Sequence, residues 1–290
     1  MGDWVAAMRA ERYEAAWALA YASLSARDPA TRDDPRLPYH QRWVWDGRPF
    51  DGRDVLVRCY HGLGDTIQFA RFLPALAARA AEVTVEAPAR LLPLLTEMPV
   101  RLVAFDDAHP LPPAQCDLEI TELDFALRLP PAAAPAPYLR AERALLPAGT
   151  IGLCHAAGDW DADRSFPPAL LAPLVDKVPC ITLVAEPSAL PVLNPAGCPF
   201  DMMATASLVA ACSLVITVDT MIAHLAGALG RPVWLLLKAE PDWRWNPASR
   251  RSSWYPTMRL YAQPRAGDWP AVLAAVERDL AARPSHAAEG

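Results

Sequence analysis

Residues 214–237 read LVITVDTMIAHLAGALGRPVWLLL, and this segment decides the fold class. An apolar run rich in β-branched residues ends at Asp219, and a helical pattern follows at once. A Gly-Arg-Pro break then precedes a second apolar run. This order predicts a strand, a helix and a second strand, which is the unit of a parallel sheet with a covered face. The chain is therefore expected to have an α/β fold.

Polar residues lie where the first strand of this segment ends and its helix begins. Open α/β sheets bind ligands at this end of their strands. Thr220 and His224 are four residues apart, so they share one face of the expected helix. The N-terminus of a helix has unpaired N–H groups and partial positive charge, which favour phosphate. The pattern favours a phosphorylated ligand, although an aspartate cap and a histidine packed against the sheet explain these residues about equally well.

Composition limits the class of protein. The chain has 290 residues, of which 53% are hydrophobic and 21% charged, as expected for a soluble globular protein with buried sheet. Its net charge of −6 argues against a general nucleic-acid binder, which needs an excess of Lys and Arg on one face. The six cysteines form no CxxC pair and are predicted to be buried thiols in a reducing compartment.

The expected location is cytoplasmic. The N-terminal residues carry charges within a helical pattern, so no signal peptide is recognised. The apolar stretch 206–237 is interrupted by Asp219, His224 and Arg231, which excludes a membrane span. Membrane association is therefore at most peripheral.

Two series of alternating strands and helices are predicted, separated by the proline-rich segment 129–137. Strands are expected at 54–60, 83–86, 100–105, 117–120, 150–155, 180–184 and the two runs quoted above. Helices are expected at 3–27, 66–80, 89–97, 168–176, 204–212 and 268–283. The predicted divisions are an N-terminal helix and connector (1–50), two Rossmann-like domains (51–140 and 141–267), and a C-terminal helix and tail (268–290), with disorder after Pro284.

The loop His61-Gly62-Leu63-Gly64-Asp65 follows the first predicted strand. Its glycines allow the backbone to turn sharply and approach a ligand. The full GxGxxG and GxxxxGK[ST] patterns are absent, so neither a dinucleotide site nor a P-loop is predicted. On these residues alone, Asp65 is better explained as a helix cap, which stabilises by about 1 kcal/mol, than as a catalyst.

A second polar loop spans residues 156–165. It contains Asp159, Asp161 and Asp163, but it lacks the glycine and terminal glutamate of a calcium loop, so no metal site is predicted. Solvated loop charges are the simpler explanation of these carboxylates. Arg164 is a more specific candidate, because a cation at this strand end is placed to meet a diphosphate.

Two motifs resemble a known family. The run GLGDTIQFARFLP (62–74) closely resembles the bacterial glycosyltransferases of family 9, related to ADP-heptose:lipopolysaccharide heptosyltransferases, above all those at the C-terminus of tetratricopeptide-repeat proteins. The run DTMIAHLAGALGRP (219–232) is similar to their donor-site motif. The runs PDWRW (241–245) and SWYPTMR (253–259) match the segments that follow it. The resemblance covers residues 40–283.

This resemblance implies a GT-B fold, in which two Rossmann-like domains face a cleft. It also implies an inverting, metal-independent transfer of a sugar from a nucleotide-diphosphate donor, with no cofactor. Asp65 matches the general base, beside His61 and within the loop of Gly62 and Gly64. Asp219 would lie near the sugar or fix its loop. The residues that match the donor and phosphate positions are Arg164, Ser165, Asp219, Thr220, Met221 and His224.

The chain also departs from these relatives. Only the helical segment 3–27 stands where they carry repeats, His61 replaces a common glutamine, and the loop 156–163 is unusually acidic. Two alternatives therefore stay open: a non-catalytic nucleotide-sugar-binding module of a larger assembly, and a nucleotide-sugar epimerase. The acceptor is a glycan, a protein or a small molecule. Tryptophans that either stack on sugars or pack in the core are Trp43, Trp45, Trp243, Trp245 and Trp254.

Overall fold

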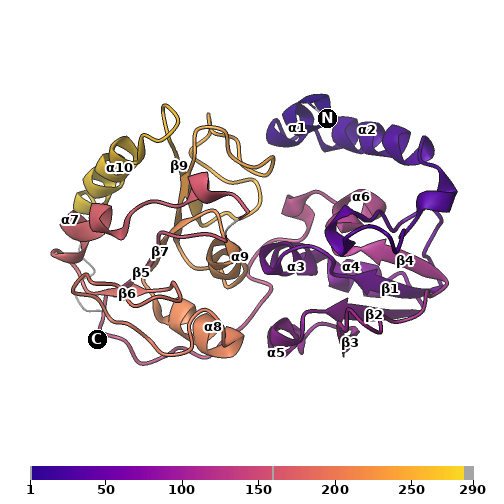
Figure 1. The fold of residues 1–290 in the computed structure, drawn as a ribbon, viewed down its shortest axis with the longest axis horizontal. Coiled ribbons are helices and arrows are strands. Elements are labelled where there is room, and N and C mark those ends of the chain that lie inside the picture. The colour runs from indigo at the N-terminus through magenta and orange to yellow at the C-terminus, as the bar shows by residue number, and fades with distance from the viewer. Residues whose placement is uncertain (1, 159, 284–290) are drawn as a thin grey trace. The chain divides into compact units, whose positions relative to one another are not determined.

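The computed structural model describes residues 2–158 and 160–283, and it divides into two units, Met1–Pro135 and Ala136–Gly290. Each unit contains its own parallel sheet with helices packed against it (Figure 1). The predicted α/β class is confirmed. The expectation of disorder after Pro284 falls outside the described residues.

The sheet of the first unit has the order β3-β2-β1-β4, and all of its pairs are parallel. The chain passes from β1 to β2 and β3 on one side, and then returns to place β4 on the other side of β1. A switch point therefore lies between β1 and β4. The strands are β1 (Asp54–Arg58), β2 (Glu82–Ala87), β3 (Arg101–Ala104) and β4 (Cys116–Glu119), and the helices are α3 (Leu63–Phe69), α4 (Leu73–Ala77), α5 (Leu92–Leu95) and α6 (Leu123–Leu127).

Several predicted helices have other bounds in the structure, and two of them are interrupted. The expected helix at 3–27 is two helices, α1 (Gly2–Arg9) and α2 (Tyr13–Ser25), because Glu11 takes a left-handed conformation with φ of 57°. The expected helix at 66–80 begins at Leu63 and is divided by a 3₁₀ turn ahead of α4. Pro74 lies in the first turn of α4 and has no N–H, so the hydrogen bond that would continue α3 is missing.

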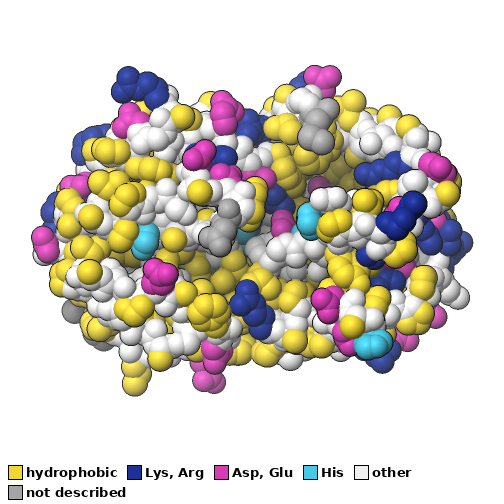
Figure 2. All heavy atoms as spheres, in the orientation of Figure 1, with side chains coloured by type: hydrophobic (Ala, Val, Ile, Leu, Met, Phe, Trp, Pro, Cys, Tyr) yellow, Lys and Arg dark blue, Asp and Glu magenta, His cyan; other side chains and the backbone are white. Residues whose placement is uncertain are grey.

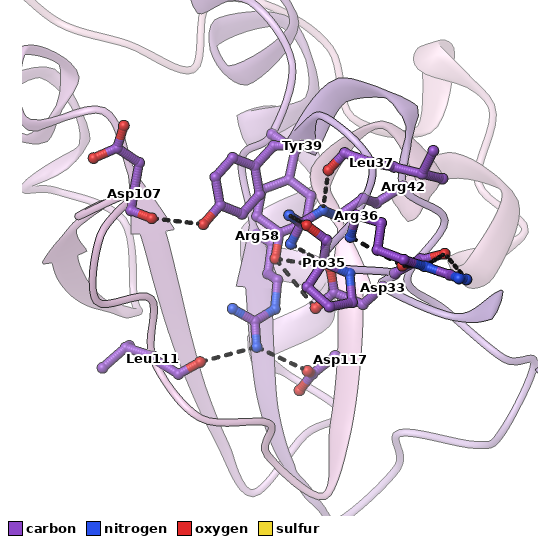
Figure 3. A network of polar contacts seen from close by, with 12 residues as sticks. Asp33, Pro35, Arg36, Leu37, Tyr39, Arg42, Arg58, Asp107, Leu111 and Asp117 are labelled. Carbon is purple, nitrogen blue, oxygen red and sulfur yellow. Dashed lines mark hydrogen bonds and ion pairs between the residues drawn. The ribbon is translucent and has the colours of Figure 1, made fainter. Parts of the chain in front are cut away.

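The connector before β1 packs on the carboxyl ends of the first sheet (Figure 3). The Tyr39 hydroxyl donates to the Asp107 carbonyl at 2.8 Å, and its ring lies 4.8 Å from that of Tyr60, which follows β1. Beneath it, Arg58 is fully buried and pairs with Glu86 and Asp117, each at 3.1 Å. Removing one partner of such a buried set would leave an uncompensated charge, so this network holds three neighbouring strands in one arrangement.

The sheet of the second unit has the order β6-β5-β7-β8-β9, again with parallel pairs throughout. Its apolar core joins the strands to α7 and α10 on one face, while α8 and α9 lie on the other (Figure 1). The sequence analysis missed β9. The strands are β5 (Ile151–Cys154), β6 (Cys180–Thr182), β7 (Leu214–Val218), β8 (Val233–Leu237) and β9 (Met258–Ala262), and the helices are α7 (Ala172–Val175), α8 (Met202–Ala211), α9 (Met221–Ala228) and α10 (Trp269–Ala281).

The surface and the cysteines agree with the composition. All six cysteines, which lie within the described residues, are buried and outside disulfides. Lys and Arg side chains are interspersed with Asp and Glu on the face shown in Figure 2. Across residues 2–158 and 160–283, no helix is both long enough and apolar enough to cross a membrane.

A close contact with Tyr255 sets the position of α9. Tyr255 is fully buried, and its hydroxyl lies 3.1 Å from Nδ1 of His224. A Cβ atom added at Gly227 would meet the Tyr255 ring at 2.5 Å. Glycine is therefore required at this point for the helix to approach the ring.

We predict that Gly227→Ala lowers the free energy of unfolding by about 1–3 kcal/mol, because the added methyl group must displace a fully buried ring. The measurement is urea denaturation followed by circular dichroism. Gly2→Ala is the matched control, because a Cβ at this other helical glycine meets nothing within 4 Å. Equal stability of the two variants would contradict the proposed contact.

Candidate functional site

Three loops at the carboxyl ends of the second sheet surround a cavity of about 180 Å³. They follow β5, β7 and β8. Because β6 lies beyond β5 while β7 lies on its other side, the strand order reverses between β5 and β7. Open parallel sheets bind ligands at such a switch point. The lining residues are Trp160, Asp161, Arg164, Asp219, Leu236, Leu237, Lys238, Glu240, Pro241 and Asp242.

Arg164 joins two of these loops. It ends a 3₁₀ turn after β5, is 8% exposed, and donates from Nη1 to the Asp219 carbonyl at 2.8 Å. Its guanidinium also stacks over the Trp160 ring at 4.0 Å. Among the described residues, its Nε atom has no hydrogen-bond partner. Two residues that the sequence placed at the site, Arg164 and Asp219, are thus in direct contact.

The loop after β8 adds residues that the sequence analysis did not single out. Lys238 extends its Nζ to within 2.7 Å of Asp161, and Asp161 lies 3.8 Å from Nε of Arg164. Glu240 and the exposed Trp160 also line the cavity. Their position in the sequence could have indicated them, because residues directly after β8 lie at the same edge of the sheet as the end of β7.

Asp219 is held in an unfavourable electrostatic environment. Burial raises its pKa to about 6, and the negative charge of Asp242 adds to this effect. Arg244, Trp245 and Arg164 act in the opposite direction. Asp242 is itself paired with Arg244 at 2.8 Å. Asp219 is therefore a carboxylate whose charge is sensitive to what occupies the cavity.

The start of α9 carries the remaining residues predicted for the second unit. Thr220 is the residue before the helix, and its side chain makes no capping bond. Half-buried Met221 begins the helix. His224 is buried, with its ring stacked on Trp245 at 5.7 Å and Nδ1 facing Tyr255. Ser165 accepts a hydrogen bond from the Ala157 amide at 2.9 Å and so shapes the loop after β5.

Packing explains most of the tryptophans that the sequence analysis left open. Trp245, Trp254 and Trp45 are buried, and Trp243 packs edge-on against Trp254 at 5.8 Å. Trp160, by contrast, is 76% exposed and lines the cavity. Its ring is therefore available to a ligand in this cavity.

The predicted residues of the first unit follow β1. Asp65 is the third residue of α3, and its Oδ2 accepts a hydrogen bond from the Gly62 amide at 3.0 Å. Gly62 precedes the helix and Gly64 lies within its first turn. His61 places Nδ1 at 2.9 Å from Glu119, which ends the neighbouring β4. Asp65 thus has a capping contact, and its role as a base stays a prediction.

No group of three or more His, Cys, Asp or Glu in residues 2–158 and 160–283 is arranged to hold a metal ion. Metal independence of the chemistry stays a prediction.

Comparison with known proteins relates this α/β fold to glycosyltransferases. Residues 198–266, which contain β7, α9 and β8, match the family model of glycosyltransferase family 9 (heptosyltransferase). This match confirms the resemblance inferred from the motif at 219–232. Comparison with the curated proteins finds no match for this chain.

Solved structures of this type share the fold. A glycosyl transferase family 9 protein from Veillonella parvula DSM 2008 is 12% identical, with 79% of this chain and 92% of that chain covered and a TM-score of 0.51. E. coli ADP-heptose lps heptosyltransferase II is 17% identical, with 77% and 99% covered and a TM-score of 0.50. E. coli heptosyltransferase WaaC is 13% identical, with 78% and 99% covered and a TM-score of 0.51.

We predict that Asp219→Asn stabilises the protein increasingly as the pH rises from 4 to 7. The folded protein keeps the Asp219 proton up to a pKa of about 6, whereas the unfolded chain releases it near 3.8. Between these values the folded state binds more protons, so the contribution of Asp219 to the free energy of unfolding falls as the pH rises, by about 3 kcal/mol in all.

The measurement is urea denaturation at pH 4, 5, 6 and 7. Asp163→Asn, which removes an exposed carboxylate from the same region, is the control and should not reproduce the pH-dependent gain. A gain for Asp219→Asn that is the same at every pH would show that Asp219 has no raised pKa.

Proposed function

We propose that the protein transfers a sugar from a nucleotide-diphosphate donor to an acceptor hydroxyl, with inversion and without a metal, in the cytoplasm. The observation that carries this proposal is the cavity at the carboxyl ends of β5, β7 and β8, because two of these strands lie in the segment that matches glycosyltransferase family 9. A nucleic-acid partner is not part of the proposal, and any membrane contact is peripheral.

The donor diphosphate is assigned to the start of α9 and to Arg164. The first amides of a helix have no partner within the helix, and its dipole places partial positive charge there. Together with the buried guanidinium of Arg164, these groups offset the charge that grows on the leaving diphosphate. The structure of E. coli WaaC with ADP-2-deoxy-2-fluoro heptose supports a donor of this class.

Asp65 is the proposed general base. It takes the proton of the acceptor hydroxyl as that oxygen attacks the anomeric carbon, and the bond to the diphosphate breaks on the opposite face. The Gly62 amide fixes the orientation of its carboxylate through Oδ2. His61, whose Nδ1 lies 2.9 Å from Glu119, is the second residue proposed to act on the acceptor.

We predict that Asp65→Asn lowers kcat for donor turnover by about 10²–10⁴-fold and leaves donor affinity unchanged. The asparagine oxygen still accepts from the Gly62 amide, so the cap survives while the proton acceptor is lost. The assay is release of nucleoside diphosphate from UDP- and ADP-sugars with lipid-linked glycan, peptide and small-molecule acceptors.

Asp201→Asn is the control, because Asp201 also accepts a hydrogen bond from a backbone amide at the start of a helix, that of Met203 at 3.0 Å. It should retain turnover. Full turnover by Asp65→Asn would refute the assignment of the base. Saturable donor binding by the wild type with no turnover would favour the non-catalytic binding module, and conversion of the donor to a stereoisomer without an acceptor would favour the epimerase.

A further inference from the structure

The lysines of this chain are unusually few. Of its 27 Lys and Arg residues, only Lys177 and Lys238 are lysines. Lys238 lines the cavity, whereas Lys177 follows α7 and pairs with Glu277 at 3.6 Å. Lysine differs from arginine in being a compact point charge with three rotatable donors, which suits contact with a phosphate oxygen.

The sheet register fixes where the backbone of Lys238 begins. Val218 on β7 pairs with Leu236 on β8 in the parallel ladder. Two residues further along, the chains reach Thr220 and Lys238. Lys238 is therefore carried directly by the end of β8, and it lines the same cavity as Asp219, which directly follows β7.

Asp161 holds the two cations of the cavity on one wall. Its carboxylate lies 2.7 Å from Nζ of Lys238 and 3.8 Å from Nε of Arg164. The side chains of Lys238 and Asp161 are 26% and 15% exposed, so the pair is largely shielded from water. Two cations and one carboxylate leave a net positive charge on this wall, and Arg164 is already fixed by its bond to the Asp219 carbonyl.

The rest of the cavity lining is acidic, so each cation in it matters for an anionic ligand. Its lining also contains Asp219, Glu240 and Asp242. Without Lys238, Arg164 would be the only cation in the lining, facing four carboxylates, and a doubly charged diphosphate would be repelled in this low-dielectric space. With Lys238, a bound diphosphate would meet two cations on this wall, one from the loop after β5 and one from the end of β8.

We propose that Lys238 is a second phosphate-binding residue, whose ammonium, positioned by Asp161, contacts a non-bridging oxygen of the donor diphosphate. This inference rests on the proposed function, because it assumes a diphosphate in the same cavity. It makes Lys238 the residue that distinguishes nucleoside diphosphates from monophosphates, while Arg164 and α9 bind either.

Acetylation of the native protein tests this directly, because the second lysine is an internal control. The protein is treated with an amine-acetylating reagent, with and without UDP, ADP or pyrophosphate, and the two lysines are followed by mass spectrometry. At ten times the Kd, the probe should slow acetylation of Lys238 about tenfold. Lys177, whose side chain is 57% exposed, should react at the same rate with or without it.

Calorimetry of variants separates phosphate contact from a structural role. Lys238→Met should weaken UDP or ADP binding by about 10–100-fold, weaken the monophosphate much less, and leave the nucleoside unchanged. Lys238→Arg should recover part of the loss, and Lys177→Met should change nothing. Circular dichroism confirms that each variant is folded.

The results of these experiments distinguish a failure of the Lys238 proposal from a failure of the proposed function. Equal losses for nucleoside, monophosphate and diphosphate in Lys238→Met would mean that Lys238 only supports its loop through Asp161, and would overturn the inference. Unchanged diphosphate binding together with unprotected Lys238 would also overturn it, while leaving the transferase proposal intact. Absence of any nucleotide binding by the wild type would refute both.

Discussion

The hydrogen bond from Arg164 to the Asp219 carbonyl is the constraint on which the site of the second unit depends. It ties the loop after β5 to the end of β7, two parallel strands that are neighbours because the order of strand addition reverses between them. Two further contacts in the cavity involve the same guanidinium. Trp160 stacks on the guanidinium, and Asp161 approaches it from the side while holding Lys238.

The buried charges of this cavity destabilise the folded state. Ionised Asp219 is buried near Asp242, and the buried Nε of Arg164 makes no hydrogen bond within the described residues. Unfavourable charge of this kind is common where a site is arranged for a ligand that supplies the missing partner. The Arg58 network of the first unit differs, since both of its carboxylates contact the guanidinium and its effect is to hold strands together.

Much of this arrangement was predictable from local pattern. The runs that became β1, β7, α9 and β8 have clear patterns, and Asp219 at the strand-to-helix junction lines the candidate cavity. The pattern failed where backbone conformation decides, as at Glu11, whose left-handed φ breaks the first helix. It also failed for β9, a strand of five residues at the edge of the sheet, which is recognised by its pairing with β8.

Residues that depend on neighbouring strands were the hardest to find. Lys238 belongs to no motif recognised in the sequence, and the strand order β5-β7-β8 brings it to Asp161, 77 residues away. Trp160 likewise becomes a candidate through its exposure beside Arg164. His224 was correctly placed on α9, but its ring environment of Trp245 and Tyr255 comes from segments far along the chain.

Calorimetric titration of UDP, ADP, GDP and CMP into the wild type, Arg164→Ala and Thr220→Ala tests the central claim most directly. Arg265→Ala, which removes an exposed arginine from the same unit, is the control. The account predicts that one of the nucleotides binds the wild type at micromolar strength, that both site variants weaken it, and that the control does not. If the folded wild type binds none of the four, or if the site variants bind as tightly as the wild type, the cavity at β5, β7 and β8 is not a donor site.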